Sequence, residues 1–401
     1  MTSDRASNCR VIVVGGGYAG VMAANRLTQR DDMTVTLINP RAQFVERIRL
    51  HQLAADTHPA VHDMREVLAP DVELLVDSVE LIDTGSRTVT VGGGGALAYD
   101  YLIYSVGSHS ADADVPGVRD HAYPVSTLEE AQRLRSALAD TPESAPVTVV
   151  GAGPTGIEMA SELAENGRSV TLICGRVLGP YLHPRVRRGI AKRLRRMGVT
   201  VIDGAGATVT TVAADSVDLA DGRQITSAAT IWAAGFAVPE LALRSGLSTD
   251  EAGRLLTDET LTSVDDDRII AAGDCAAPSA LPYRMSCQAA NQLGPQAADT
   301  MLRRFDGVEP TAAMVGFAGQ CISLGRTYGA FQFARRNDVA VPFHLGGRPA
   351  ARLKELVCKS TVDALRFEAR KPGKRLIRIS DPHRRTILEE RSTMATLQAV
   401  R

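Results

Sequence analysis

The segment 11–20, VIVVGGGYAG, constrains the fold of this 401-residue chain more than any other stretch. A run of β-branched residues leads into Gly15, Gly17 and Gly20, and apolar residues at helical spacing follow. This order predicts a buried strand, a tight turn and a helix: Gly15 permits the turn, Gly17 lets a pyrophosphate approach the backbone, and Gly20 lets the helix pack on the strand. The helix N-terminus then presents free N–H groups to the phosphates. The segment therefore predicts a dinucleotide-binding site.

The same pattern occurs a second time at 147–158, VTVVGAGPTGIE. Here Gly151, Gly153 and Gly156 follow a second β-branched strand, and a further strand is expected over 170–173. Two copies of a nucleotide-binding pattern in one chain are far more specific than one. We therefore predict an α/β fold with two Rossmann-like dinucleotide-binding domains and a small C-terminal α+β region.

Strands that end in glycine follow both copies. The stretch DYLIYSVG ends at Gly107, its counterpart ATIWAAG ends at Gly235, and a last strand, RIIAAGD, ends at Gly273 and Asp274. Ligands of such sheets bind at the carboxyl ends of the strands, so we expect these residues to border the cofactors. A Gly-Asp pair on its own is only a turn signal.

The positions that normally bind ribose carry no acid in either copy. The strand expected over 33–38 ends at Asn39, whose amide can hydrogen-bond a ribose more weakly than a carboxylate does, and Arg41 could reach a phosphate. Both could equally be turn residues around a proline. In the second copy Cys174 takes this position, and Arg176 could pair with a 2'-phosphate or be a solvated loop residue.

The stretch after the first two strands carries weaker signals. We expect a strand over 72–79 and count its last residue, Val79, among the candidate cofactor contacts. His51, His58 and His62 do not have the spacing of a metal site, so we interpret them as solvated or capping residues. We therefore expect no metal centre.

Composition excludes several other classes. The chain has 45 Lys and Arg against 46 Asp and Glu, and only 4% aromatic residues, which argues against nucleic-acid binding. None of the six cysteines forms a C-x-x-C pair, so the sequence predicts neither a zinc ribbon nor a redox dithiol. The N-terminus resembles no signal peptide, and no stretch approaches the roughly 20 apolar residues of a membrane span. We expect a cytoplasmic protein.

The two glycine motifs, the strands that end in glycine and the late A-x-G-D together resemble the flavoproteins with two dinucleotide-binding domains, the pyridine-nucleotide oxidoreductases. The resemblance covers roughly residues 8–300. Within this group the chain looks most like the type II NADH dehydrogenases, which are NAD(P)H:quinone oxidoreductases. The finer match lies in GAGPTGIEMASELAE, which includes Glu158, and in CQAANQ, which resembles the quinone-site motif A-Q-x-A-x-Q.

The resemblance implies the cofactors and their contacts. FAD would bind the first glycine loop, with Asp274 on its ribityl chain, and NAD(P)H would bind the second. Glu158 would lie beside the nicotinamide and the flavin, although a carboxylate in the first turn of a helix is also stabilised without any function. Gln288 and Gln292 would border a quinone, or form a polar stripe on an exposed helix.

The implied division is residues 1–113 and 242–315 for the FAD domain, 114–241 for the inserted NAD(P)H domain and 316–401 for the C-terminal region. The implied activity passes a hydride from NAD(P)H to FAD and then electrons to a quinone or similar small acceptor. A reductase of a ferredoxin-like carrier, and a redox-sensing FAD protein resembling apoptosis-inducing factor, remain alternatives.

Contact with a membrane surface is a further expectation. A helix over 349–367 would gather apolar residues on one face, flanked by basic residues that continue to Arg375. Such a helix can lie on an anionic membrane, at the inner face of the cell membrane. The alternative is an ordinary helix that packs on the flavin domain, which the scarcity of aromatic anchors favours.

Overall fold

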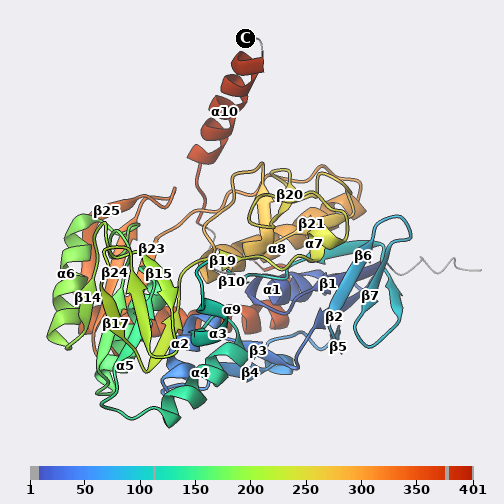
Figure 1. Ribbon diagram of the computed structural model, residues 1–401. Coiled ribbons are helices and arrows are strands. Elements are labelled where there is room, and N and C mark those ends of the chain that lie inside the picture. Colours follow the sequence, from blue (N-terminus) through green and yellow to red (C-terminus); the bar gives the residue numbers. More distant parts are fainter. Residues whose placement is uncertain (1–8, 112–113, 375–378, 400–401) are drawn as a thin grey trace, which may run out of the picture.

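The computed structural model describes residues 9–111, 114–374 and 379–399, with the backbone alone for 392–399. The predicted boundary at residue 113 and Arg375 lie outside these ranges. Two parallel sheets, their helices and a smaller C-terminal sheet form the body of the molecule (Figure 1). The predicted α/β fold is therefore confirmed.

The first glycine motif lies at the centre of a five-stranded parallel sheet. Its strand β1 (Cys9–Val14) is buried on both faces because Val11 to Val14 are all apolar, and it pairs in parallel with β2 (Met33–Asn39) and β9 (Tyr101–Tyr104). Helix α1 (Tyr18–Leu27) follows the loop and is buried along its whole length. The sheet order is β21 (Ile269–Ala271), β9 (Tyr101–Tyr104), β1 (Cys9–Val14), β2 (Met33–Asn39) and β5 (Val72–Val76).

A second parallel sheet repeats the first almost strand for strand. Its order is β11 (Ala122–Pro124), β18 (Ala229–Trp232), β12 (Val147–Val150), β13 (Val170–Ile173) and β14 (Thr200–Ile202). In both sheets the strand before the glycine loop is central, and the strand that ends in glycine pairs with it. The helices of this half are α3 (Val118–His121), α4 (Leu128–Asp140), α5 (Pro154–Glu165) and α6 (Pro184–Arg196). The repeat predicted from the sequence is therefore present in the structure as two similar parallel sheets.

Each half also carries a three-stranded antiparallel sheet: β6 (Val79–Asp83), β7 (Thr88–Val91) and β8 (Ala96–Ala98) in the first, and β15 (Val209–Val212), β16 (Ser216–Leu219) and β17 (Gln224–Thr226) in the second. Shorter pairs are β3 (Gln43–Val45) with β4 (Val61–Asp63), β10 (His109–Ser110) with β19 (Phe236–Ala237), and β20 (Leu255–Thr257) with β22 (Ala276–Pro278). Short helical elements are η1 (Arg47–Arg49), α2 (Leu50–Ala54), η2 (Met64–Glu66), α7 (Leu241–Arg244) and η3 (Gly273–Cys275).

The single strand expected over 72–79 was wrong. The chain forms β5, turns at Asp77 and Ser78, and begins β6 at Val79. The Asp77 carboxylate causes the break, because it accepts hydrogen bonds from the backbone N–H groups of Ser78 and Gly93. Val79 therefore begins a strand of the antiparallel sheet rather than ending a strand of the parallel one.

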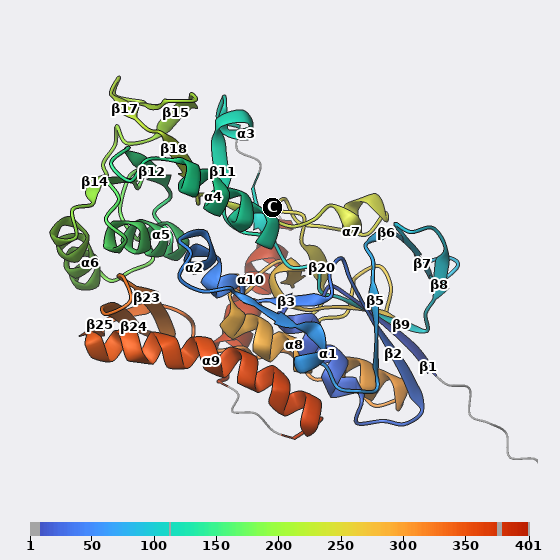
Figure 2. The ribbon, with the colours of Figure 1, turned by 90° about the horizontal axis from the view of Figure 1, so that it is seen from below.

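The C-terminal region consists of an antiparallel sheet and two helices: β23 (Gly319–Ser323), β24 (Gly329–Ala334), β25 (Ala340–Gly347), α9 (Arg348–Arg370) and α10 (His383–Ala399). Helix α9 packs on α1, on α8 (Cys287–Phe305) and on this sheet (Figure 2), whereas α10 projects from the body (Figure 1). Leu365, predicted on the apolar face of α9, is fully buried in the core around α1, and Leu356 remains exposed. Of the other apolar residues on this face, Leu353, Val357 and Ala364 are partly buried.

Candidate dinucleotide and acceptor sites

The first glycine loop has the geometry of a phosphate cradle. Gly15 has φ +100°, and a Cβ there would lie 2.4 Å from the carbonyl oxygen of Ser105. A Cβ at Gly20 would lie 1.9 Å from the carbonyl oxygen of Gly15, so helix and strand meet only because Gly20 lacks a side chain. Gly17 begins α1 without a side-chain cap, and no described atom lies within 4 Å of its missing Cβ. The loop thus leaves open space beside the uncapped N–H groups of a helix.

The second loop repeats this geometry. Gly151 has φ +144°, and a Cβ there would lie 2.6 Å from the carbonyl oxygen of Ala233. A Cβ at Gly156 would lie 2.2 Å from the carbonyl oxygen of Gly151, whereas the space at Gly153 is open among the described residues. Gly153 precedes Pro154, which occupies the first turn of α5. Both loops therefore meet the steric requirements that the motif predicts.

Asn39 contacts the glycine loop itself. Its Oδ1 accepts from the backbone N–H of Gly16 at 2.9 Å, and its Nδ2 donates to the Arg41 carbonyl oxygen at 2.7 Å. The buried amide thus braces the loop. Arg41 forms an exposed ion pair with Glu129 of α4 at 2.8 Å.

Asp274 belongs to a polar cluster at the carboxyl ends of β9 and β21. Its Oδ2 accepts from Ser108 Oγ at 2.8 Å and lies 3.4 Å from Nη1 of Arg47. The same Nη1 donates to Ser108 Oγ at 3.0 Å, and Gly107 (φ +72°) lies beside this guanidinium. Gly273, with φ +86°, turns the chain out of the sheet. Arg47 was missed in the sequence because nothing local distinguishes it from the other arginine of the RIR stretch.

The residues predicted around the second nucleotide occupy the carboxyl edge of the second sheet. Gly235, with φ +83°, follows β18. Cys174 is buried, and burial raises the pKa of its thiol to about 12. Arg176 is exposed and has no ion-pair partner among the described residues. Cys174 rather than a carboxylate holds the position at the end of β13, and Asp203, which follows the neighbouring strand β14, also contributes to the raised pKa of the Cys174 thiol.

Glu158 lies in a buried ion pair that joins the second domain to the C-terminal region. Its Oε1 lies 2.9 Å from Nζ of Lys354 and accepts from the backbone N–H of Ser323 at 2.8 Å. Burial alone would raise the pKa of this carboxyl, but Lys354 and His51 hold it below its usual value. Burial likewise opposes the charge of Lys354, yet Glu158 raises its pKa. Both groups are therefore charged at neutral pH.

His51 is the third member of this cluster, and its interpretation as a solvated or capping residue was wrong. It is 3% exposed, and its Nδ1 lies 3.7 Å from Oε2 of Glu158. Burial lowers its pKa to about 4, so the imidazole is neutral. Of the other two histidines, His58 caps its own loop by accepting from Ala60 N, and His62 lies 3.0 Å from a Glu46 oxygen.

Three buried polar atoms of this neighbourhood lack hydrogen-bond partners among the described residues: His51 Nε2, Tyr181 Oη and Ser323 Oγ. Buried polar groups are usually paired, so such a group indicates a partner that the protein does not supply. The Glu158–Lys354 pair and these atoms together could receive a polar molecule.

Gln288 and Gln292 lie on one face of α8, as predicted, but in different surroundings. Gln292 donates from Nε2 to the carbonyl oxygens of Gln288 and Gly316, and its Oε1 accepts from Ile379 N at 3.1 Å. These bonds fix α8 to the C-terminal segment and use both amide hydrogens. Gln288 is half-buried, and its side chain makes no hydrogen bond within the described part of the chain.

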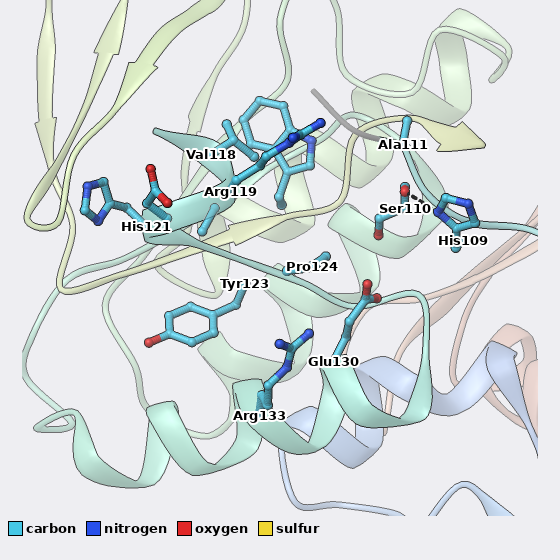
Figure 3. Close-up of a pocket in the computed structure, with 13 residues that line it drawn as sticks. His109, Ser110, Ala111, Val118, Arg119, His121, Tyr123, Pro124, Glu130 and Arg133 are labelled. Carbon is cyan, nitrogen blue, oxygen red and sulfur yellow. Dashed lines mark hydrogen bonds between the residues drawn. The ribbon is translucent and has the colours of Figure 1, made fainter. Parts of the chain in front are cut away.

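A cavity of about 430 Å³ opens elsewhere, between β10 and the second sheet (Figure 3). Its lining includes His109 of β10, Glu130 and Arg133 of α4, and Trp232 at the end of β18. None of the predicted site residues lines it. The described side chains contain no group of three or more His, Cys, Asp or Glu that could hold a metal ion.

Comparisons with known proteins agree with this geometry. The pattern of the family described as pyridine nucleotide-disulphide oxidoreductase matches residues 9–300. An NADH dehydrogenase-like protein of Mycobacterium tuberculosis is 30% identical over 313 residues, which cover 71% of this chain and 78% of that protein. A type II NADH:quinone oxidoreductase of Staphylococcus haemolyticus is 26% identical, over 81% of this chain and 89% of its own. The solved sulfide:quinone oxidoreductase of Aquifex aeolicus shares the fold with a TM-score of 0.75 at 19% identity, over 95% of each chain.

Proposed function

Since the chain belongs to the pyridine nucleotide-disulphide oxidoreductase family, we propose that it is an FAD-dependent NAD(P)H dehydrogenase whose electrons pass to a quinone or a similar small acceptor. FAD, when bound, supplies the chemistry: it takes a hydride from the nicotinamide and gives two electrons to the acceptor. The relatives whose names state NADH:quinone activity support this acceptor class. The observation that carries the proposal is the pair of glycine cradles, each at the centre of its own parallel sheet.

The residues at the first cradle fit FAD. The open space at Gly17 and the uncapped start of α1 suit a pyrophosphate, since a Cβ at this position would occupy the space that the ligand needs. Asp274, with Arg47 and Ser108 holding it, offers a carboxylate at the neighbouring strand end. Asn39 supports the loop by holding the Gly16 N–H. Arg41 is paired with Glu129, so a phosphate would have to compete with that carboxylate.

The second cradle fits a reduced nicotinamide dinucleotide, and the edge around it favours acceptance of NADPH. Gly153 gives the same open approach as Gly17. Cys174 is protonated and buried, so it does not repel a phosphate. The exposed Arg176 can pair with a 2'-phosphate in a charge-assisted hydrogen bond.

Glu158, Lys354 and Gln288 are the residues that we assign to the acceptor. A quinone oxygen gains negative charge during reduction, and the Lys354 ammonium, which Glu158 keeps charged, can stabilise that oxygen. Gln288 has amide hydrogens free to donate to a carbonyl oxygen without adding charge. Gln292 has both amide hydrogens bound to backbone, and we assign it the role of fixing α8.

We propose that contact with a membrane is peripheral. No helix within the described ranges combines the length and the apolarity that crossing a membrane requires. Helix α9 was the first candidate for contact with a membrane surface, but its residues Leu365 and Val362 are buried in the core around α1.

Steady-state oxidation of NADH and NADPH with a panel of acceptors tests the proposal. A soluble quinone, ferricyanide, a ferredoxin and oxygen are compared on the FAD-loaded protein. We expect NAD(P)H oxidation to be faster with the quinone than with the ferredoxin or oxygen. Preference for the ferredoxin would establish the carrier reductase instead, and slow turnover with every acceptor would favour the redox-sensing alternative.

A further inference from the structure

Arg47, which lies beside the proposed FAD site, contacts three segments that are far apart in the sequence. It belongs to η1, just before α2. Its Nη1 donates to Ser108 Oγ at 3.0 Å and to Asp274 Oδ2 at 3.4 Å. Its Nε donates to the carbonyl oxygen of Ser126 at 3.2 Å. The guanidinium is therefore held by three partners at once.

These partners belong to both halves of the molecule. Ser108 follows β9, and Asp274 lies in η3 after β21, which pairs with β9 in the first sheet. Ser126 directly precedes Thr127, the N-cap of α4 in the second half. Arg47 thus joins the carboxyl edge of the first sheet to the start of α4.

Ser126 is itself fixed by further hydrogen bonds. Its backbone N–H donates to Glu130 Oε2 at 2.8 Å, and its Oγ lies 2.8 Å from Ser110 Oγ of β10. Strand β10 pairs with β19, and these two strands lie where the chain passes from the first sheet to the second and back. Because this partner is held by its neighbours, the position of the Arg47 charge is fixed as well.

The Arg47–Asp274 pair lies at the strand ends where parallel sheets bind their ligands. The two side chains are 30% and 15% exposed, so both can meet a ligand at this edge. The other side chain that donates to Asp274 in the described part of the chain is Ser108, whose Oγ lies 2.8 Å from Oδ2. Without Arg47, the Asp274 carboxylate would keep a hydroxyl partner but no neighbouring positive charge from η1.

An uncompensated carboxylate at this edge would oppose an anionic cofactor. FAD carries a diphosphate, and its flavin gains negative charge when it is reduced. Like charges repel, and a cation beside the carboxylate offsets that repulsion. Arg41, an arginine near the same loop, is already paired with Glu129. The compensating charge at Asp274 therefore comes from Arg47.

From these contacts we propose that Arg47 is a positioning residue for FAD: it orients the Asp274 carboxylate and compensates its charge, so the site binds FAD more tightly and favours its reduced form. The inference rests on the proposed function in one respect, the presence of FAD at the first cradle. It adds a residue that sets the reduction potential of the flavin. A lysine at position 47 could keep the charge but could not reproduce the forked contacts of the guanidinium.

The reduction potential of the bound flavin tests the charge. It is measured on the FAD-loaded protein by equilibration with a reference dye, without an acceptor. In Arg47→Gln the preference for reduced over oxidised FAD should fall about tenfold, which lowers the potential by about 30 mV for a two-electron couple. Arg47→Lys should stay near the wild-type potential. The double variant R47Q/D274N removes both charges and should recover most of the shift.

The release of FAD from the loaded protein on dilution gives a second readout. Arg47→Gln should release FAD about tenfold faster, because a hydrogen-bonded charge pair is broken. Arg47→Lys should lie between this variant and wild type. The control Arg135→Gln removes the same charge from α4, where Arg135 forms an exposed pair with Asp56, and should change neither quantity.

A wild-type potential in Arg47→Gln, or an equal shift in Arg135→Gln, would overturn the proposal. Far-UV circular dichroism checks that the variants fold. If Arg47→Gln does not fold, Arg47→Lys decides: an unchanged potential with faster FAD release supports the proposal, and a potential lowered by 30 mV or more contradicts it. A wild-type protein that takes up no FAD would instead contradict the proposed function, so the two failures are distinguishable.

Discussion

Replacement of Lys354 by Met tests the buried pair that joins the second domain to the C-terminal region. With Nζ and Oε1 2.9 Å apart, their Coulomb attraction is about 6 kcal/mol at an effective dielectric constant of ~20. Desolvation of the two ions offsets most of this attraction. In Lys354→Met the Glu158 carboxylate keeps its desolvation cost and retains chiefly the Ser323 N–H. We expect the variant to be about 3–5 kcal/mol less stable.

The double variant K354M/E158L should recover most of this loss, because it removes both charges together. The effect should also depend on pH in a defined window. The pKa of Glu158 is lowered on folding, so its contribution is present above its unfolded value of ~4.3 and is lost as pH falls through the folded value. The pKa of Lys354 is raised, so its contribution is present below ~10.4 and is lost as pH rises through the folded value.

Urea unfolding of the FAD-loaded proteins, followed by far-UV circular dichroism between about pH 5 and pH 10, measures these differences. We expect the penalty of the single variant to grow as pH rises above ~4.3, because without Lys354 burial raises the pKa of Glu158, and we expect a small penalty for the double variant. A single variant as stable as wild type, or a double variant that is as unstable as the single one, would refute the electrostatic argument.

Four further predictions concern individual residues. Gly20→Ala places a Cβ 1.9 Å from a backbone oxygen, so the purified protein should lose most of its FAD; normal flavin content would contradict the cradle. Arg176→Ala should raise KM for NADPH about tenfold and leave KM for NADH unchanged, and equal effects on both would exclude a phosphate contact. His51 has a folded pKa of about 4, below its unfolded ~6.5, so the protein loses stability as pH falls between these two values. His51→Asn should remove about 3 kcal/mol of this acid-dependent loss of stability in urea titrations. An unchanged dependence of stability on pH would show that the buried His51 does not cause it. In stopped-flow experiments, Gln288→Ala should slow quinone reduction about tenfold with flavin reduction intact, and Gln292→Ala should instead lower stability; the reverse pattern would exchange their roles.

The parts of the fold that the sequence predicted are those with a local steric cause. A strand, a tight turn and a helix can pack this closely only with glycine at positions 15 and 20. The motif in the sequence therefore predicts the local geometry. The repeat then predicted the second sheet, whose strand β13 begins and ends at the expected residues. The break at Asp77 escaped prediction because apolar residues stand on both sides of the short polar pair Asp77 and Ser78.

The parts of the site that escaped prediction depend on contacts between distant segments. Lys354 contacts Glu158 only because α9 packs against the C-terminal sheet and α1, and no spacing in the sequence predicts that contact. Asn39 had the expected position, but its partner proved to be the Gly16 N–H. His51 was interpreted as solvated or capping because its spacing from His58 and His62 is not that of a metal site, and only the packing of α2 against α5 shows that it is buried.

Anaerobic titration of the purified protein with NADH and NADPH, followed through the visible flavin absorbance, tests the central claim most directly. We expect one FAD per chain, complete loss of that absorbance with one equivalent of reduced nicotinamide, and its return when a soluble quinone is added. A protein that takes up no FAD, or whose flavin neither nucleotide reduces, would contradict the assignment of the two cradles.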